Sequence, residues 1–364
     1  TWVYNAGYPV LYVDMEEIDE DSMTITLRQQ RFVKEGPLFY EDNEYRDNPY
    51  YDPAKAAEFA KQIWQIPIQF EMFDGIIIDD VDAEILGNKL LTQKNVTITM
   101  QRWIANDDGA EFYIFNPNQE HYYRVIYDDY LFSLIEKNFE TFSDLNQFNI
   151  ISDLYQEMLS GYISPVTYLQ FIATAWNRDN YNVYINDPLV LMHDIIIDSL
   201  LQIDSMLCGL DKNDKLRDNF REYARNLLSP IMQDMGGWNS TDDDSEEIIR
   251  LRSELLNAMI IFDHNDIIQE GEDILLDAIT NENGTLFIDL DSLDPNLLQQ
   301  YFSAALGTLG SGVYDTVLDI FFDDNYNSLQ SVILNAFGAV YQNEDLTQAT
   351  IDLLLYNSEL SASQ

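Results

Sequence analysis

Apolar and polar residues alternate with a period of two through much of the first 128 residues. In residues 66–72 every even-numbered position is apolar, and residues 24–28, 96–100 and 112–116 repeat the pattern. Such alternation places one face of a strand on a core and the other face in water, as in antiparallel sheets. Residues 1–128 are therefore predicted to form an antiparallel β-sandwich domain.

After residue 128 the spacing of apolar residues becomes helical. Ser164-Pro165, Asp187-Pro188 and Asp294-Pro295 each combine an N-cap residue with proline at the first helical position, which is typical of a helix start. The predicted buried stripes are Tyr168, Phe171, Ile172 and Ala175; Met192, Ile196, Leu200, Ile203 and Leu207; Leu298, Tyr301, Phe302 and Ala305; and Ile248, Leu251, Leu255, Leu256 and Met259. Residues 129–364 are predicted to form a superhelical array of the HEAT or armadillo type, which makes the chain a multidomain β + α protein.

The charge is strongly one-sided. The 364 residues include 64 Asp and Glu but only 19 Lys and Arg, a formal net charge of −45. Such a field repels phosphate backbones, so no nucleic acid is expected among the partners. Because 46% of the residues are hydrophobic and 13% aromatic, the chain is nevertheless expected to fold.

Cysteine content, apolar runs and glycosylation motifs bear on the cellular location. The single cysteine, Cys208, excludes an internal disulfide, and its apolar neighbours predict a buried thiol. No run of about 18 apolar residues is present, so no membrane-spanning segment is predicted in this chain. Three N-glycosylation sequons begin at Asn95, Asn239 and Asn283. They permit a secretory route.

Motifs for catalysis are missing from the sequence. His121, His193 and His264 are far apart, and no His-Glu-x-x-His sequence occurs, so each is predicted to be a packed or surface residue. The sequence contains neither a phosphate-binding loop nor a Gly-x-Ser-x-Gly motif. We therefore predict no catalytic, metal-binding or cofactor-binding residue in this chain.

Four short motifs follow one another in the first 128 residues. They are Trp2-Val3-Tyr4-Asn5-Ala6-Gly7-Tyr8-Pro9-Val10, Gln30-Arg31-Phe32, Trp64-Gln65-Ile66-Pro67-Ile68 and Asn116-Pro117-Asn118-Gln119-Glu120-His121-Tyr122-Tyr123-Arg124-Val125-Ile126-Tyr127-Asp128. Their order and spacing resemble the third domain of the M1 family of zinc aminopeptidases, with Asn5 in place of a glutamine and His121 in place of a glycine. Residues 294–301 and 312–315 resemble parts of the helical fourth domain more loosely.

Two of the motif residues also have structural roles that follow from their chemistry. Gly7, followed by Tyr8-Pro9, suits a turn into an edge strand, where the missing N–H of proline costs nothing. Arg124 is expected to pair with a nearby carboxylate such as Asp128 or Asp129.

The resemblance implies what the parent protein does. Residues 1–128 would be the third domain, and residues 129–364 an incomplete ERAP-like C-terminal domain. Zinc, its ligands and the general base would lie upstream of Thr1, in a catalytic domain that acts on peptides, and this chain would bridge to the peptide chamber and cap it. Its partners would be the N-terminal and catalytic domains of the same protein and the peptide substrate, and the helical domain could form a homodimer. The protein would be extracellular or at the cell surface, with any membrane anchor upstream of this chain.

Two other functions remain open at this stage. One is a catalytically inactive M1-like protein that binds partners or has a structural role. The other is an acidic helical-repeat scaffold that recruits cationic partners through its charge. The preceding ~250 residues would separate these from the enzyme, because a domain of ordinary size there would carry or lack the His-Glu-x-x-His helix.

Overall fold

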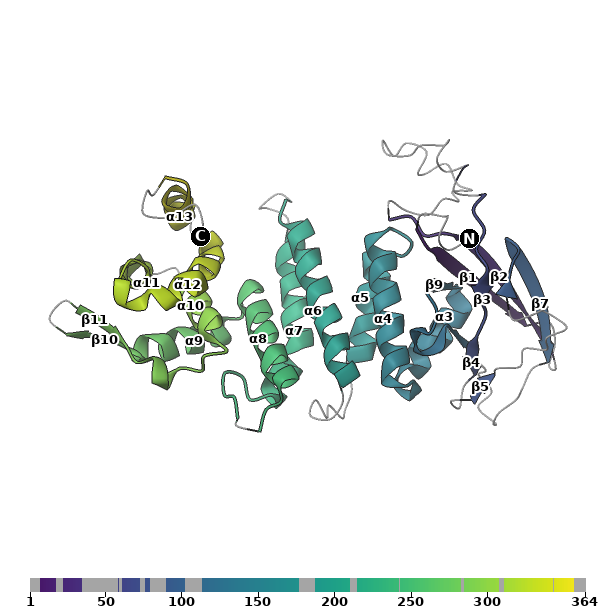
Figure 1. The fold of residues 1–364 in the computed structure, drawn as a ribbon, viewed down its shortest axis with the longest axis horizontal. Coiled ribbons are helices and arrows are strands. Elements are labelled where there is room, and N and C mark those ends of the chain that lie inside the picture. Colours follow the sequence, from purple (N-terminus) through teal and green to yellow (C-terminus); the bar gives the residue numbers. More distant parts are fainter. Residues whose placement is uncertain are drawn as a thin grey trace. The chain divides into compact units, whose positions relative to one another are not determined.

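The computed structural model describes residues 7–17, 22–34, 58, 61–72, 76–78, 90–101, 113–176, 187–209, 215–241, 243–282, 285–307, 311–342 and 344–356. These residues are mostly helical, with a few small sheets (Figure 1). Contacts divide the chain into two compact units, Thr1–Arg178 and Asp179–Gln364. They are called unit 1 and unit 2 below.

The largest sheet of unit 1 has four strands in the order β7-β2-β1-β9. Its strands are β1 (Pro9–Glu17), β2 (Ser22–Arg31), β7 (Asn95–Gln101) and β9 (Arg124–Tyr127). Strands β1 and β2 form an antiparallel hairpin, and β7 is antiparallel to β2. Along β2 the side chains of Met23, Ile25 and Leu27 are buried while the residues between them are half-buried, as the period of two predicts.

The fourth strand corrects two predictions about this sheet. β9 runs parallel to β1, with Val10 opposite Arg124, so the sheet is not antiparallel throughout. The chain leaves the sheet after β7 and returns to it only at β9. This long connection allows β9 to run in the same direction as β1. Strand β1 is consequently central rather than an edge. Pro9 is tolerated there because it is the first residue of the strand, and the pairing with β9 begins only at Val10.

Two smaller sheets complete the β part of unit 1. In one, β3 (Ile66–Pro67) pairs with β6 (Leu90–Leu91); in the other the order is β5 (Ile76–Ile78), β4 (Phe70–Met72) and β8 (Tyr113–Phe115). The predicted strand over residues 66–72 is thus divided between two sheets. Pro67 has no N–H to continue a ladder, so the chain changes partners directly after it. The alternation of buried and half-buried side chains still continues across the break.

Three α-helices follow β9 in unit 1, and capping side chains define where each begins. They are α3 (Asp129–Asn138), α4 (Asp144–Leu159) and α5 (Pro165–Trp176). Asp128 accepts a hydrogen bond from Leu131 N at 2.7 Å at the start of α3. At α5, Ser164 Oγ accepts one from Thr167 N at 3.0 Å, which confirms the predicted helix start. The predicted stripe of α5 is buried: Tyr168, Phe171, Ile172 and Ala175.

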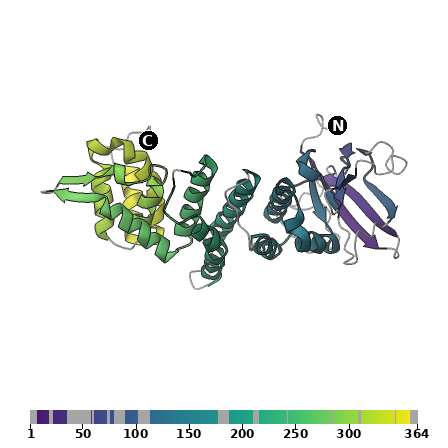
Figure 2. The same ribbon diagram turned by 90° about the horizontal axis from the view of Figure 1, so that it is seen from below.

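The described residues of unit 2 form helices and one hairpin. Its helices are α6 (Asp187–Leu207), α7 (Leu216–Asp234), α8 (Glu246–Ile261), α9 (Asn265–Asp277), α10 (Leu298–Gly307), α11 (Ser311–Phe321), α12 (Gln330–Ala336) and α13 (Glu344–Tyr356). The hairpin pairs β10 (Ile279–Glu282) with β11 (Thr285–Ile288), two strands that the sequence pattern does not predict. Figure 2 shows this hairpin projecting from the helices of unit 2.

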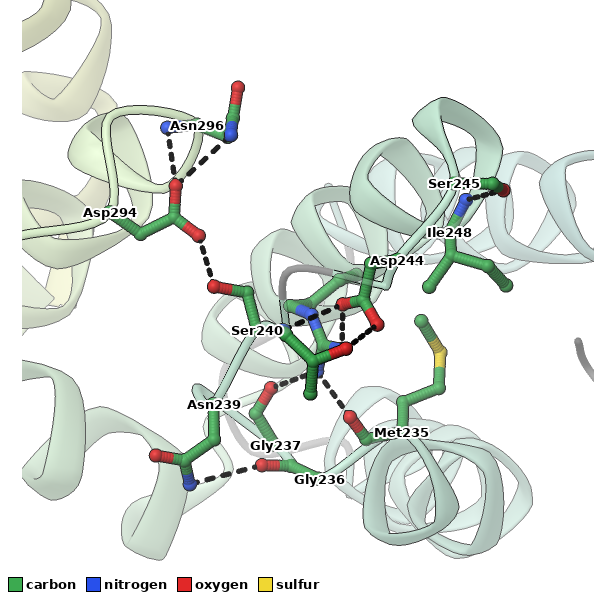
Figure 3. A network of polar contacts seen from close by, with 12 residues as sticks. Met235, Gly236, Gly237, Asn239, Ser240, Asp244, Ser245, Ile248, Asp294 and Asn296 are labelled. Atoms are coloured by element: carbon green, nitrogen blue, oxygen red, sulfur yellow. Dashed lines mark hydrogen bonds and ion pairs between the residues drawn. The ribbon is translucent and has the colours of Figure 1, made fainter.

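Helix α10 begins later than predicted. Asp294 does not cap a helix: its Oδ1 accepts a hydrogen bond from Asn296 N at 2.9 Å, only two residues along the chain (Figure 3). This Asx turn competes with the helical conformation, so the helix starts at Leu298. The predicted stripe of α10 is still buried at Tyr301, Phe302 and Ala305.

The position of Cys208 also differs from the prediction. The thiol is exposed, because Cys208 follows the last residue of α6 and the buried stripe of that helix has ended by then. The stripe itself is buried at Met192, Ile196, Leu200 and Ile203. Among the residues that the structure describes, no helix is both long enough and apolar enough to cross a membrane.

Candidate functional site at the sheet-to-helix junction

The side-chain amide of Gln29 joins two distant segments of unit 1. It is fully buried, and its Oε1 accepts a hydrogen bond from Trp64 N at 2.7 Å. Its Nε2 donates to Trp64 O at 2.9 Å and to Gln93 O at 2.9 Å. Because Gln29 satisfies backbone groups that have left the sheet ladder, it holds the end of β2 against the segment before β3.

Asn116 folds the turn that leads from β8 into β9. Its backbone is left-handed, with φ of 57°, a conformation that asparagine tolerates better than most residues. Its Oδ1 accepts a hydrogen bond from His121 N at 3.0 Å, and its Nδ2 donates to His121 O at 2.8 Å and to Tyr123 O at 3.0 Å. One buried side chain therefore fixes the path of residues 116–123.

Amide side chains attach this turn to helix α4. Asn118 N donates to Asn146 Oδ1 at 2.7 Å, and Gln119 Nε2 donates to Asn149 Oδ1 at 2.6 Å. Asn146 and Asn149 lie one turn apart on α4 and thus present their side chains on one face. Both are buried, so the polar face of α4 packs on the turn instead of facing water.

Arg124 connects β9, β1 and α4. Its Nε donates to Tyr8 Oη at 3.0 Å, and its Nη1 donates to Asp153 Oδ1 at 2.7 Å. The other oxygen of Asp153 accepts a hydrogen bond from Val125 N at 3.1 Å. The predicted partner Asp128 is instead engaged by backbone N–H groups, and its Oδ2 accepts from Met15 N at 2.6 Å. The predicted pairing of Arg124 with a neighbour in sequence is therefore wrong.

Gln29, Asn116, Arg124 and Asp153 thus form a junction between the sheets and the helices of unit 1, called the junction below. Stacked aromatic rings extend it to the connection between α4 and α5. The ring centroids of Tyr8 and Phe32 are 5.2 Å apart at 12°, and those of Phe32 and Tyr162 are 5.2 Å apart at 10°. Tyr122 packs edge-on against Tyr8. The guanidinium of Arg124 lies 5.7 Å from the centroid of Tyr8 and 5.6 Å from that of Phe32, within reach of a cation–π attraction.

Two buried carboxyl groups of α4 face this junction. Burial raises the pKa of Asp153 to about 6, although Arg124 and the Val125 N–H favour its charged form. Burial also raises the pKa of Glu157 well above its ordinary value, and the charge of Asp153 adds to the effect. Glu157 Oε1 is buried and accepts no hydrogen bond from the described residues. The junction therefore holds protons more firmly than the unfolded chain does.

A cavity of about 430 Å³ opens beside Arg124. Polar and aromatic side chains line it, including Tyr8, His121, Tyr122, Arg124, Ser152 and Asp153. They can position a polar group, but they do not form a nucleophile–base pair of the kind that covalent catalysis requires. Within the described ranges, no group of three or more His, Cys, Asp and Glu side chains is arranged to hold a metal ion.

The three histidines lie in separate places. His121 is in the junction turn, with its ring centroid 6.3 Å from that of Tyr123. His193 is buried in α6. His264 is the N-cap of α9, where its Nδ1 accepts a hydrogen bond from Ile267 N at 3.4 Å.

A second cavity, of about 410 Å³, lies in unit 2 among α6, α7, α8 and α10. Asp204 at its wall bonds to two guanidinium groups, Arg217 Nη2 at 2.7 Å and Arg221 Nε at 2.7 Å. Burial pushes the pKa of Asp204 upward, but the hydrogen bonds from Arg221 and Arg217 outweigh it and hold that pKa below its ordinary value. Ile260 and Asn257 are among the apolar and amide side chains that complete the wall.

A buried arginine shapes the loop between α7 and α8. Arg252 is 1% exposed and donates to Gly237 O at 2.8 Å, to Asp244 Oδ2 at 2.7 Å and to Met235 O. The loop carries the sequon of Asn239, which is exposed and whose Nδ2 donates to Gly236 O at 3.2 Å (Figure 3).

The other two sequons differ in their setting. Asn95 is exposed on β7, the outer strand of the four-stranded sheet. Asn283 lies outside the described residues.

A family model matches the whole helical part of the chain. The model of the ERAP1-like C-terminal domain matches residues 112–364, from the junction turn through all of unit 2. The chain belongs to this family. The ERAP1-like C-terminal domain thus includes Asn116, Arg124 and Asp153, so the junction connects it to the preceding sheet.

Comparison with curated proteins finds aminopeptidases. Aminopeptidase M1-B of Oryza sativa subsp. japonica is 23% identical over 274 residues, which are 74% of this chain and 26% of that protein. The alanine/arginine aminopeptidase of Saccharomyces cerevisiae is 21% identical over 361 residues, 99% of this chain and 35% of that protein. These matches confirm the resemblance to M1 aminopeptidases.

An archaeal protein is similar as well. Tricorn protease-interacting factor F2 of Thermoplasma volcanium is 21% identical over 265 residues, 72% of this chain and 25% of that protein. The chain therefore spans about a quarter to a third of the length of the relatives it matches.

The sequence motifs identified one side of the junction and missed the other. Gly7, Tyr8, Phe32, Asn116 and Arg124 all come from the four motifs, and the structure brings them together. Their partners on α4 could not be chosen from the sequence, since Asp and Asn are abundant everywhere. The available signal was a row of polar residues, at 146, 149 and 153, at helical spacing on one side of α4.

Proposed function

We propose that this chain is the non-catalytic C-terminal part of a zinc aminopeptidase that releases amino-terminal residues from peptides. The observation that carries the proposal is the ERAP1-like C-terminal domain match over residues 112–364, together with relatives named as aminopeptidases over up to 99% of the chain. In this proposal zinc and its ligands belong to a catalytic domain of the same polypeptide, and the described side chains contribute no step of the reaction.

The proposed architecture has two parts. Residues 1–128 form a β-sandwich like the third domain of M1 enzymes, and residues 129–364 form a helical superhelix. The sheets formed by strands within residues 9–127 support the first part, and the helices α3–α5 of unit 1 and α6–α13 of unit 2 support the second.

The proposed role is to bridge to the peptide chamber and to cap it. A bridging segment must transmit forces without deforming. The junction suits this because hydrogen bonds of Arg124 and Val125 to Asp153 tie its sheet to α4, and stacked rings tie the sheet to the α4–α5 connection. The cavity of unit 2 mixes apolar walls with amides such as Asn257 and Gln299, which can contact the side chains and backbone of a peptide.

The function is tested by capture of the native polypeptide with an antibody against this chain. The captured protein should contain zinc and hydrolyse a leucyl anilide, and a zinc chelator should abolish that activity. The isolated 364-residue chain should be inactive in the same assay with zinc added. If the captured polypeptide contains no zinc and shows no turnover, the proposal is wrong and the protein is the catalytically inactive M1-like protein.

We propose an extracellular or cell-surface location for the protein, with glycans on Asn95 and Asn239. Both side chains are exposed, and each begins a sequon that ends in threonine. Secretion of the chain from animal cells should yield a product whose mass falls after treatment with a peptide N-glycosidase. Asn239→Gln should remove one glycan, and Asn265→Gln, which lies outside any sequon, should remove none.

A further inference from the structure

Helices α6 and α8 pack directly against one another, and charged side chains gather at their contact. Arg250 on α8 bonds through Nη2 to Asp194 Oδ2 on α6 at 2.6 Å, and through Nη1 to Glu254 Oε1 at 3.2 Å. Asp198, one turn after Asp194, acts electrostatically on both carboxyl groups. One guanidinium is therefore shared between two acidic side chains, and a third acidic side chain lies near both.

If every carboxyl group at this contact is ionised, a buried oxygen acceptor is left without a hydrogen-bond donor. Asp194 Oδ1 is buried and accepts no hydrogen bond from the described residues. Glu254 and Asp194 lie close together, since both bond to the guanidinium of Arg250. Ionised carboxylates only accept hydrogen bonds, so the two can bond to each other only when one of them is protonated. A proton on Glu254 supplies the missing donor.

The partly buried position of Glu254, whose side chain is 36% exposed, favours that proton. Burial raises the pKa of Glu254 to about 7, the hydrogen bond to Asp194 and the charges of Asp194 and Asp198 act in the same direction, and Arg250 opposes them. Helix α10 presents an amide rather than a charge beside this residue, since Gln300 Nε2 donates to Ser253 Oγ at 2.8 Å. The buried His193 is the neighbour of Asp194 on α6.

We propose that a proton on Glu254 bonds it to Asp194 and makes the α6–α8 contact a pH-sensitive latch. The latch is closed in mildly acidic solution. It opens as Glu254 ionises near and above neutral pH, because two adjacent carboxylates then repel one another across the helix contact.

The latch lies next to the cavity of unit 2. Leu201 and Asn257 line that cavity, and they follow Asp198 and Glu254 by three residues on the same two helices. Loosening the α6–α8 contact therefore moves two walls of the cavity. This inference stands on unit 2 alone and does not depend on the aminopeptidase assignment.

Hydrogen–deuterium exchange of the full chain between pH 5.5 and 8.5, corrected for intrinsic exchange, tests the latch. Protection of α6 and α8 amides should fall about tenfold between pH 6 and 8, the factor that corresponds to one pKa unit of differential interaction. Glu254→Gln should abolish this step, because its amide donates to Asp194 at every pH. Glu246→Gln, exposed on the same helix, should keep the step.

Two results would overturn the latch. One is wild-type protection that does not change between pH 6 and 8. The other is a step that persists in Glu254→Gln, which would assign it to another group such as His193. If Glu254→Gln fails to fold, carboxyl-carbon NMR of Glu254 in the wild-type chain decides: a midpoint near 7 supports the latch, and one below 5 refutes it.

Discussion

Gln29 shows how much one buried amide contributes to unit 1. Replacing it with leucine keeps the volume but leaves the Trp64 N–H and the carbonyls of Trp64 and Gln93 without their partner. A buried polar group without a partner costs about 1–3 kcal/mol, so we expect Gln29→Leu to lower the free energy of unfolding by about 3 kcal/mol. Urea unfolding measures the change. Gln170→Leu, exposed on α5, should change it by less than about 0.5 kcal/mol.

Glu157 makes the stability of unit 1 depend on pH. Its ordinary pKa is 4.5 and the pKa in the folded chain is well above that, so the folded state binds more protons than the unfolded state between these values. Stability therefore falls as pH rises from about 4.5 toward the native pKa, and Asp153 adds to the fall up to about 6.

Removing the ionisable group should remove this loss. Glu157→Gln should leave the melting temperature nearly unchanged at about pH 4.5 and raise it above that of the wild type at pH 8. Calorimetry over this pH range measures the effect. Glu140→Gln, which is exposed, serves as the control and should track the wild type; a gain for Glu157→Gln that does not depend on pH would contradict the explanation.

Helices α9 and α10 can approach one another closely because residue 271 is a glycine. A Cβ on Gly271 would lie 2.4 Å from Trp238 Cζ2 and 2.8 Å from Ala304 Cβ. Trp238 cannot move aside, because its Nε1 donates to Ile267 O at 3.1 Å and its ring stacks on Tyr301 with centroids 4.9 Å apart. The glycine is thus required by packing, although it lowers helix propensity by about 1 kcal/mol.

Alanine at this position should therefore destabilise unit 2. We expect Gly271→Ala to lower the free energy of unfolding by about 1–3 kcal/mol, the usual effect of overpacking a core. Gly307→Ala is the matched control, since a Cβ there meets no atom within 4 Å, and it should be neutral or slightly stabilising. Urea unfolding of both variants checks the difference, and equal behaviour would mean that Trp238 and α10 adapt.

Elements with strong local signals were predictable from the sequence. Helices α5 and α8 carry an N-cap serine and an apolar stripe that is buried as expected, and β2 alternates as expected. The start of α10 was not predictable, because Asp294 can cap a helix or close an Asx turn, and its second oxygen is taken by Ser240 Oγ at 2.6 Å. The β10–β11 hairpin was missed because both strands are short.

The candidate site at the junction could likewise be predicted only in part. Its motif residues were identified, but the charge partner of Arg124 is Asp153, which lies 29 residues away and competes with nearer acids. What selects Asp153 is its burial against β9, a property of the tertiary structure. Periodicity and composition contain no information about such a choice.

At the scale of the whole molecule, the net charge of −45 opposes compactness. Salt shortens the screening length from about 30 Å at 0.01 M to about 3 Å at 1 M, so added sodium chloride should raise the melting temperature by several degrees at pH 7.5. Differential scanning fluorimetry measures the shift. Near the calculated isoelectric point of 4.1 the same salt should have little effect, and an equal shift there would exclude charge repulsion as the cause.

The parallel pairing of β1 with β9 determines when the sheet can be completed during synthesis. Strand β1 finds its partner β2 within a few residues, but its other edge stays open until residues 124–127 have left the ribosome. A nascent chain that ends before this point exposes the unpaired backbone of a central strand, a known risk for aggregation. Fragments of this protein should therefore be expressed with their end beyond Tyr127, or at a position that removes β1 as well.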